Sequence, residues 1–270
     1  MDWDKALAID SPAVAGRLEA FIRDELGQAG FGRLVLGLSG GIDSAVSCAL
    51  AVRTLGQEKV TALIMPYRSS LAENVKDAED LAARLGVTAF TIDITPMVDA
   101  YYQRDPEADN LRRGNMMARQ RMAVLYDFSQ QLGALVLGTG NKTEAMLGYT
   151  TLFGDNACAL NPIADLWKTQ VRQLATWLDI PAAIIDKPPS ADLWAGQTDE
   201  DELGLTYELA DRILHGICHK WLDPTELTAE PYNLPREAVE RVVNLIRSNR
   251  FKRSLPAAAR LTAGPYEPDI

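Results

Sequence analysis

The hydrophobic positions of the first half of the chain fall into two alternating patterns. Short, nearly continuous apolar runs predict strands at 34–38, 60–65, 88–92 and 134–137. Between them, apolar residues three and four positions apart predict helices at 11–28, from 42 to the glycine at 56, at 71–85 and at 109–132. Strands that alternate with helices in this way predict an α/β fold, a doubly wound parallel sheet with helices on both faces. Nearly continuous apolar strands suit such a sheet, because its strands are covered on both sides.

The second half of the chain is more polar. Helical spacing predicts helices at 201–215 and 235–248. The segment 187–204 is polar and lies within what we expect to be one domain over residues 1–270. A polar segment of this length is either a functional lid or a disordered connection, and we expect an active-site lid loop.

Composition limits the classes of function. Hydrophobic residues make up 47% of the chain and charged residues 24%, as in ordinary globular proteins. The net charge of −10 argues against a dedicated nucleic-acid binder, which usually shows a basic face. No apolar run reaches membrane-spanning length, and the three cysteines lack paired spacing. We therefore expect a cytoplasmic protein without disulfides and without a membrane partner.

The first predicted strand leads into a glycine turn that carries the main candidate chemistry. Gly40 and Gly41 allow the backbone to approach an anion, while Ser39, Ser44 and the N–H groups of the next helical turn can donate to phosphate oxygens. Asp43 would repel phosphate unless a cation such as Mg²⁺ joined it. The alternative is an ordinary strand-to-helix junction in which Asp and Ser only start the helix.

This turn resembles the Ser-Gly-Gly-x-Asp-Ser pyrophosphatase loop of ATP-cleaving enzymes that include NAD synthetases, GMP synthetases, asparagine synthetases and tRNA-modifying enzymes. Four further motifs are similar to those of the NAD synthetase family, in its ammonia-dependent form. They are Gly-Asn-Met-Met-Ala-Arg-Gln-Arg-Met (114–122), Gly-Thr-Gly-Asn-Lys-Thr-Glu (138–144), Pro-Ile-Ala-Asp-Leu-Trp-Lys-Thr-Gln-Val (162–171) and Pro-Ser-Ala-Asp-Leu (189–193). The resemblance covers most of the chain and implies a single ATP-binding domain of the adenine-nucleotide hydrolase type.

The resemblance also implies roles for particular residues. Those expected to bind ATP are Gly37, Leu38, Ser39, Gly40, Gly41, Ile42, Asp43, Ser44, Arg68, Thr139, Lys168 and Ser190. Asp43 and Glu144 are expected to hold Mg²⁺, and Asp43, Glu144 and Lys168 to form the catalytic set. Those expected to bind the substrate dinucleotide are Asn115, Arg119, Leu152, Asp155, Ala159, Phe251 and Lys252, the last pair often across a homodimer.

Glu144 and the arginines can also be explained without a bound ligand, whereas Lys168 cannot. Glu144 alone is consistent with an acidic residue in the first turn of a helix, where the dipole favours it. Lys168 at a helix start is unfavourable unless a polyphosphate offsets the conflict. The arginines at 112, 113, 119 and 121 are either a solvated basic face or, as we favour in an acidic chain, a phosphate-binding cluster.

Two positions depart from the family pattern. Leu152 and Ala159 stand where a lysine and an aspartate usually contact deamido-NAD. Their joint loss is consistent with the replacement of an ion pair that leaves the fold intact, or with a different acid acceptor.

The resemblance thus implies a ligase that uses ATP, Mg²⁺, deamido-NAD and ammonia, with the ammonia free or delivered by a separate donor protein. Two alternatives stay open, the same ATP chemistry on another acid such as nicotinate mononucleotide, and a non-catalytic nucleotide-binding regulatory module. A tRNA-modifying enzyme is disfavoured, because the chain is acidic and has no Cys-x-x-Cys pair.

Overall fold

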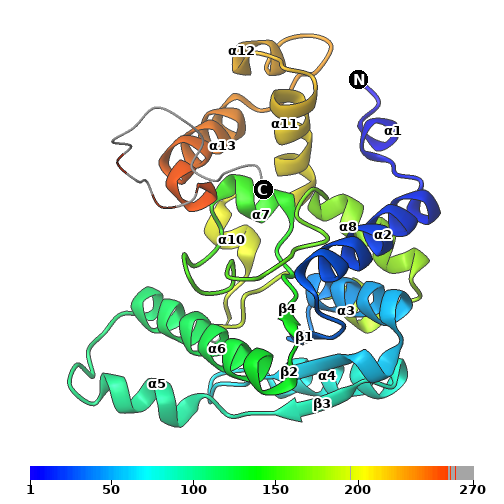
Figure 1. The fold of residues 1–270 in the computed structure, drawn as a ribbon. Helices are drawn as coiled ribbons and strands as arrows, with labels where there is room; N and C mark the ends of the chain where they lie inside the picture. The colour runs from blue at the N-terminus through cyan, green and yellow to red at the C-terminus, as the bar shows by residue number, and fades with distance from the viewer. Residues whose placement is uncertain (195, 255, 257–258, 260–270) are drawn as a thin grey trace.

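A computed structural model describes residues 1–194, 196–254, 256 and 259, and its centre is a parallel sheet of four strands in the order β3-β2-β1-β4. The strands are β1 (Leu34–Gly37), β2 (Val60–Ile64), β3 (Thr88–Thr91) and β4 (Leu135–Val136). Strand β1 pairs with β2 on one side and with β4 on the other (Figure 1). The chain therefore builds the sheet outward from β1 in one direction and then returns to add β4 on the other side. Such a reversal marks the place where ligands bind in open α/β sheets.

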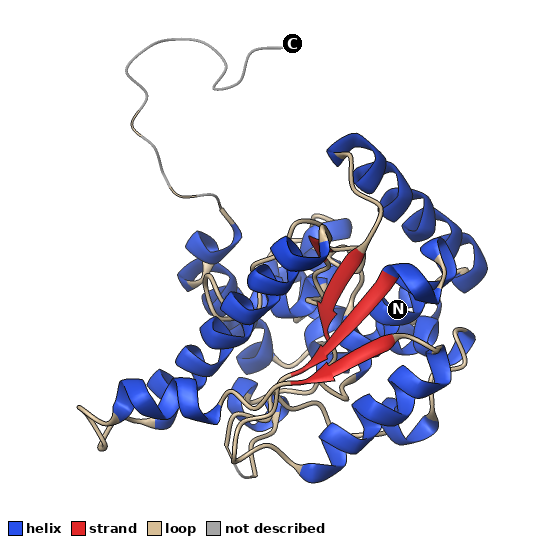
Figure 2. Cartoon of the chain, turned by 60° about the horizontal axis from the view of Figure 1, so that its bottom comes forward, coloured by secondary structure: helices blue, strands red, loops and turns tan. Residues whose placement is uncertain are grey.

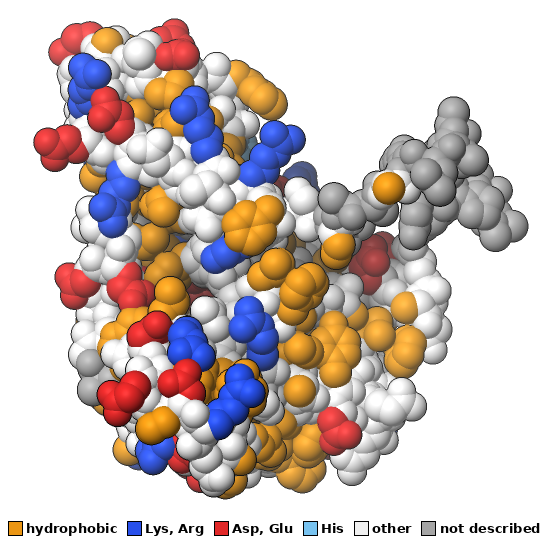
Figure 3. Space-filling model, turned by 90° about the vertical axis from the view of Figure 1, so that its left-hand side faces the viewer, with side chains coloured by type: hydrophobic (Ala, Val, Ile, Leu, Met, Phe, Trp, Pro, Cys, Tyr) orange, Lys and Arg blue, Asp and Glu red, His pale blue; other side chains and the backbone are white. Residues whose placement is uncertain are grey.

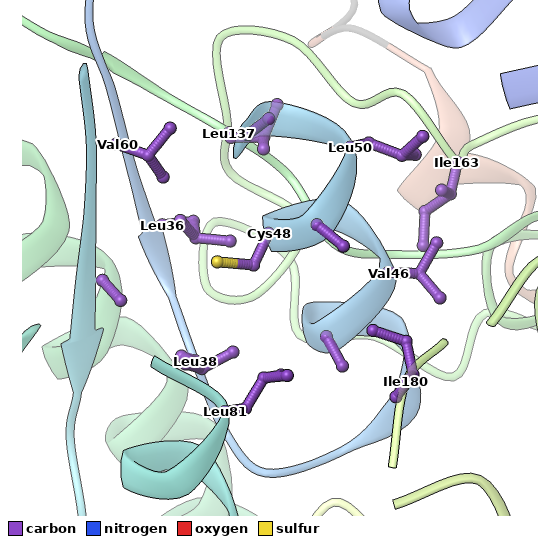
Figure 4. Close-up of a cluster of buried hydrophobic side chains, with 14 of the residues drawn as sticks. Leu36, Leu38, Val46, Cys48, Leu50, Val60, Leu81, Leu137, Ile163 and Ile180 are labelled. Atoms are coloured by element: carbon purple, nitrogen blue, oxygen red, sulfur yellow. The ribbon is translucent and has the colours of Figure 1, made fainter. Parts of the chain in front are cut away.

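Helices cover both faces of the sheet, which confirms the predicted α/β fold (Figure 2). One face packs against α2 (Ser11–Ala29), α3 (Ile42–Leu55), α4 (Ala72–Leu85) and α8 (Lys168–Trp177). Alternate strand residues, such as Leu34 and Leu36 of β1, belong to this core. Figure 4 shows Leu36 beside Cys48 of α3. Cys48 lies wholly inside this core, and burial raises the pKa of its thiol to about 12. This cysteine is therefore a packing residue, as a small apolar side chain would be.

The opposite face packs against α5 (Thr95–Tyr102) and α6 (Asn110–Leu132). Val35 of β1, Leu63 of β2 and Val136 of β4 point to this side. Strand β3 behaves differently, since all four of its residues are exposed and it lies at the sheet edge. The expectation that every strand is covered on both faces is wrong for β3, whose Thr-Ala-Phe-Thr sequence is the least apolar of the longer strands.

The later helices form a separate core beside the sheet. It combines α1 (Trp3–Leu7), α7 (Lys142–Leu147), α11 (Tyr207–His219), α12 (Pro224–Leu227) and α13 (Arg236–Ser248). Trp167 and Tyr207 are its largest fully buried side chains. The short helices α9 (Ala182–Ile185) and α10 (Asp199–Leu203) and the 3₁₀ turns η1 (Gln57–Lys59) and η2 (Arg250–Arg253) complete the described chain.

The helix predicted at 201–215 is two helices in the structure. Helix α10 ends at Gly204, which adopts a left-handed φ of 67°, and α11 begins after Thr206, whose hydroxyl accepts from the N–H of Leu209. A glycine that ends one helix and a threonine that caps the next separate them. The helix predicted at 235–248 is confirmed as α13.

None of the helices in the described part of the chain combines the length and the apolar character that crossing a bilayer requires.

Two histidines on α11 give the second core a pH-dependent stability. His215 and His219 stack with ring centroids 5.1 Å apart, and Lys142 Nζ lies 3.0 Å from His219 Nε2. Burial, and then the positive charges of His219, Lys220 and Lys142, lower the pKa of His215. The pKa of His219 is also lowered, first by burial and then by Lys142.

We expect these histidines to destabilise the fold as the pH falls. The unfolded chain takes up protons near pH 6.5, while the folded pair takes them up only at lower pH. The histidine contribution is therefore undiminished above about pH 6.5 and decreases as the pH falls below that value. Urea unfolding measures this contribution to the free energy of unfolding. The wild type and a His215→Leu/His219→Gln variant are compared at pH 7.5 and at pH 5.5. If the stability difference between the two proteins were the same at both pH values, the histidines would not be responsible.

Candidate active site

A cavity of about 590 Å³ lies at the carboxyl ends of β1 and β4, where the topology reverses. Both glycine turns line it, the first through residues 37–39 and 41–44 at the end of β1 and the second through residues 138–140 after β4. Fourteen of the predicted site residues line this cavity: Gly37, Leu38, Ser39, Gly41, Ile42, Asp43, Ser44, Asn115, Thr139, Glu144, Asp155, Lys168, Ser190 and Lys252. The structure therefore brings these fourteen residues together around one cavity, and their binding roles stay predictions.

The turn after β1 is held in shape by its own polar groups. The Ser44 hydroxyl donates to the Gly41 carbonyl at 2.9 Å and accepts from the Ser39 N–H at 3.2 Å. Gly40 has a left-handed φ of 80°, and a Cβ there would lie 2.2 Å from the Asn74 carbonyl oxygen at the start of α4. Helix α3 then begins after Gly41, without a side-chain cap. The first three residues of α3 line the cavity, and the first N–H groups of a helix have no partner within it, so this helix start is suited to binding phosphate.

Lys168 joins the two carboxylates that were predicted to be catalytic. Its Nζ lies 2.5 Å from Asp43 Oδ2 and 3.2 Å from Glu144 Oε1, and its side chain is only 4% exposed. Asn141 completes the group, since its side-chain amide donates to Asp43 Oδ1 at 2.9 Å and its Oδ1 accepts from the Glu144 N–H. Three segments far apart in sequence are therefore fixed around one ammonium group.

A third carboxylate, that of Asp199, lies in the same cavity as this group. Asp199 is buried, and its Oδ2 accepts from the Tyr207 hydroxyl while Oδ1 has no partner among the described residues. Burial raises the pKa of Glu144, an effect that Lys168 partly offsets. For Lys168, burial acts to lower the pKa, but Asp43 and Glu144 outweigh it and the pKa is raised.

The donor set fits a magnesium ion supplied together with phosphate. No three His, Cys, Asp or Glu side chains in the described chain are grouped so that they alone could hold a metal ion. Magnesium normally takes only one or two protein carboxylates and completes its shell with phosphate and water oxygens. Asp43 and Glu144 supply two such carboxylates. Burial raises the pKa of Glu144 and of Asp199, and an added cation would favour the ionised form of both.

A buried chain of hydrogen bonds that begins at α11 positions Lys168. Asp211 of α11 is fully buried and accepts from the Thr143 hydroxyl at 2.5 Å and from the Thr169 N–H at 2.8 Å. The Thr143 hydroxyl in turn accepts from the Lys168 N–H at 2.9 Å. Burial raises the pKa of Asp211, and these hydrogen bonds oppose the shift. Asp211 thus connects the starts of α7 and α8, which carry Glu144 and Lys168.

The other end of the cavity is lined by residues predicted to bind the acceptor. Asn115 Oδ1 accepts from the Thr151 hydroxyl at 2.7 Å, and Asp155 Oδ1 accepts from the Thr151 N–H at 2.7 Å. Lys252 of η2 donates to the carbonyls of Gly148 and Thr150 at 2.7 and 2.8 Å. Burial lowers the pKa of Lys252, and the nearby charge of Asp155 opposes that shift. These polar groups surround space suited to a hydrogen-bonding ligand.

Six predicted residues lie outside the cavity lining. They are Gly40, Arg68, Arg119, Leu152, Ala159 and Phe251. Arg68 pairs with Asp99, and Arg119 donates to the Leu152 carbonyl at 3.2 and 3.3 Å. The N–H of Ala159 donates to Val136 and continues the β4 pairing, while Phe251 is 59% exposed.

The arginine cluster of α6 divides into separate roles. Arg112 pairs with Asp105, and Arg113 donates to the carbonyls of Ala108 and Pro106. These two hold the loop before α6, whereas Arg121 lines the cavity.

Sequence reasoning did not single out Asn141, Asp199 or Asp211, and it included Arg121 only as one member of the arginine cluster. Asn141 directly precedes a helix that has glutamate three residues later, so a capping-box pattern was available as a signal. For Asp211 no local pattern exists, because its partner Thr143 is distant in sequence. Asp199 is one of several acidic residues in a polar segment, and nothing in that segment distinguishes it from its neighbours.

Comparisons with known proteins show the family of the chain. Residues 14–256 match the sequence model of the NAD synthase family. The chain is 50% identical to the NH(3)-dependent NAD(+) synthetase of Chlorobaculum tepidum over 95% of its length and 92% of that protein. It is also similar to two solved structures, which it covers completely. An NMN synthetase from Francisella tularensis is 35% identical over 94% of this chain with a TM-score of 0.84, and an NH3-dependent NAD synthetase from Campylobacter jejuni is 32% identical over 93% with a TM-score of 0.79. A family match over most of the chain, relatives of nearly equal length and a shared fold together show that this chain belongs to the NAD synthase family.

Proposed function

We propose that this protein is an ammonia-dependent NAD synthetase, which uses ATP to amidate the nicotinate carboxylate of deamido-NAD and releases AMP and pyrophosphate. The observation that carries the proposal is the Lys168, Asp43 and Glu144 group beside the glycine turn. ATP is the co-substrate of the family to which the chain belongs. Relatives of this chain are named NH(3)-dependent NAD(+) synthetases, which supports both the reaction and the nitrogen source.

The first step activates the carboxylate. A carboxylate oxygen of the acceptor attacks the α-phosphorus of ATP, the bond from the α-phosphorus to the bridging oxygen breaks, and pyrophosphate leaves. The free N–H groups at the start of α3 and the Lys168 ammonium stabilise the charge that develops on the leaving group. Positioning and charge neutralisation provide most of the rate increase in such transfers, so no dedicated proton-transfer residue is required.

The second step forms the amide. Ammonia attacks the carbonyl carbon of the acyl-adenylate, AMP leaves with the former carboxylate oxygen, and the nitrogen loses a proton. Segment 187–204, apart from Ala195, which is outside the described residues, borders the cavity through Ser190, Gln197 and Asp199. We propose that this segment is the lid that excludes water, since water would hydrolyse the adenylate.

We also propose that Asp43 and Glu144 hold Mg²⁺ when ATP is bound. The ion would neutralise charge on the polyphosphate and orient it. Lys168, which pairs with both carboxylates, would then bind phosphate oxygens as well.

Product analysis tests the proposed reaction. With ATP, Mg²⁺, ammonium and deamido-NAD, we expect stoichiometric NAD, AMP and pyrophosphate, measured by mass spectrometry and a coupled pyrophosphate assay. Release of ADP and phosphate, or no amide with any acid, would contradict the proposal. Glutamine supplied in place of ammonium should give no turnover.

A second acceptor has specific support. Leu152 and Ala159 replace the lysine and aspartate typical of the family, and one structure similar to this chain is that of an NMN synthetase. Neither residue lines the cavity of the single chain. Nicotinate mononucleotide assayed beside deamido-NAD distinguishes the acceptors, and a higher kcat/KM for the mononucleotide would favour this second candidate.

We propose that the protein is a homodimer with its acceptor site near the interface. Arg119 and Phe251, both predicted to bind the dinucleotide, lie on the surface instead of in the cavity. Figure 3 shows hydrophobic side chains gathered on the face where α5 and α6 lie. A second copy would cover such a surface, and sedimentation equilibrium measures whether it does.

A further inference from the structure

The cationic side chains that line the cavity differ in their partners. In the described chain they are Arg121, Lys168, Arg172, Lys187 and Lys252. Lys168 pairs with Asp43 and Glu144, Arg172 with Glu208, and Lys187 with Asp77. Arg121 and Lys252 contact no carboxylate among the described residues and donate only to backbone carbonyls. These two cations are therefore the ones without a local counter-charge.

Arg121 presents its guanidinium group to the cavity from α6. Its Nε donates to the Met65 carbonyl at 3.0 Å, just beyond the end of β2. Its Nη1 and Nη2 groups have no hydrogen-bond partner among the described residues. The Met65 carbonyl thus holds the guanidinium group at Nε, while the donors on Nη1 and Nη2 stay free. Paired donors of this kind match the two oxygens of a carboxylate or phosphate.

The surroundings of Arg121 favour an anionic ligand over a neutral one. Burial lowers the pKa of Arg121, and the charges of Asp192 and Asp155 oppose this shift without making an ion pair. A largely buried cation without a counter-ion is costly, and an anion that enters the cavity would relieve that cost. The phosphate end already has Lys168 and the first turn of α3.

Two observations associate Arg121 with the acceptor end of the cavity, its place on the helix of Asn115 and the influence of the Asp155 charge on its pKa. Asn115, on the same helix, and Asp155 both belong to the polar group around Thr151. Lys252, the other cation without a carboxylate partner, also lies against this group. In the proposed reaction a carboxylate must approach the negatively charged α-phosphate. A free cation at this end of the cavity would reduce the repulsion between the two groups.

We propose that Arg121 binds an anionic group of the acceptor and positions the acceptor against ATP, an inference that rests on the proposed function. The free Nη donors take two oxygens of the acceptor, while Nε stays on the Met65 carbonyl. The residue acts by binding and orientation and transfers no proton.

Arg121→Lys tests this role, because it keeps the charge and removes the paired donors. Arg113→Lys is the matched control, since Arg113 lies on the same helix and also donates to backbone carbonyls, but away from the cavity. We expect Arg121→Lys to raise the KM for deamido-NAD about tenfold or more, with the KM for ATP changed less than about twofold. Arg113→Lys should leave both constants unchanged.

Direct binding separates this inference from the proposed reaction. Calorimetry with deamido-NAD alone requires no turnover, and we expect a matching loss of affinity in Arg121→Lys. An Arg121→Ala variant should regain part of that affinity when guanidinium ion is added, which a purely structural role would not produce. Unchanged deamido-NAD affinity in Arg121→Lys, or a rise confined to the KM for ATP, would overturn the inference.

Discussion

Replacing Lys168 with methionine is expected to lower kcat by about 10²–10³-fold, as removal of one stabilising group from a preorganised charged site typically does. The same change should lower the free energy of unfolding by about 3 kcal/mol, because removing one partner of a buried ion pair leaves the other uncompensated. Asp43 and Glu144 would then face each other in a buried site with no cation between them. Pyrophosphate release and urea unfolding measure the two effects.

Two further variants show whether the burial of the Lys168 ion pairs causes this loss of stability. Lys76→Met removes a lysine from an exposed pair with Asp80, and we expect a change below about 0.5 kcal/mol there. Lys168→Arg retains the charge and should lose less stability than Lys168→Met. If Lys168→Met were as stable as the wild type at pH 8, the contacts of Lys168 with Asp43 and Glu144 would not stabilise the folded protein.

Replacing Asp211 with alanine is expected to destabilise the protein by about 2–4 kcal/mol, because two buried donors lose their acceptor. Those donors are the Thr143 hydroxyl and the Thr169 N–H. We also expect kcat to fall by about tenfold or more, since small displacements of catalytic groups are costly. Asp211 does not line the cavity, so its effect on turnover must act through the positions of α7 and α8.

Glu208→Ala is the matched control on the same helix. Glu208 pairs with Arg172 at a partly exposed site, where an ion pair contributes at most about 1 kcal/mol. Denaturant unfolding and steady-state kinetics of both variants provide the comparison. Equal effects on turnover in the two variants would show that the buried chain through Thr143 has no special role in placing Lys168.

The parts of the fold that local sequence predicted are those in which one pattern dominates. Buried apolar runs such as Leu34 to Leu38 and glycine-terminated helices such as the one that ends at Gly86 leave few competing structures. The prediction failed where neighbouring signals overlap, as at Gly204 and Thr206, which separate two helices within one helical pattern. Strand β3 was also misjudged, because its position at the sheet edge is not encoded within its own four residues.

The candidate site likewise contains some residues that local sequence predicts and others that it does not. The glycine turn, Glu144 and Lys168 belong to contiguous motifs, and the cavity contains all of them. Asp211 could not be identified from local sequence, and Arg121 could not be distinguished from the other arginines of its cluster, because the position of each depends on a contact with a distant part of the chain. Asp211 contacts Thr143, which is 68 residues away, and Arg121 contacts Met65, which is 56 residues away.

The strand order also constrains when the protein can first bind a nucleotide during its synthesis. The glycine turn follows the central strand near the start of the chain, but its partner Lys168 lies 125 residues later. A growing chain that has exposed only β1, β2 and β3 therefore has the turn without the second edge of the pocket. Nucleotide binding begins only after β4 has paired with β1 and α8 has emerged, so ligand-dependent protease protection of ribosome-bound chains would report the completion of the sheet.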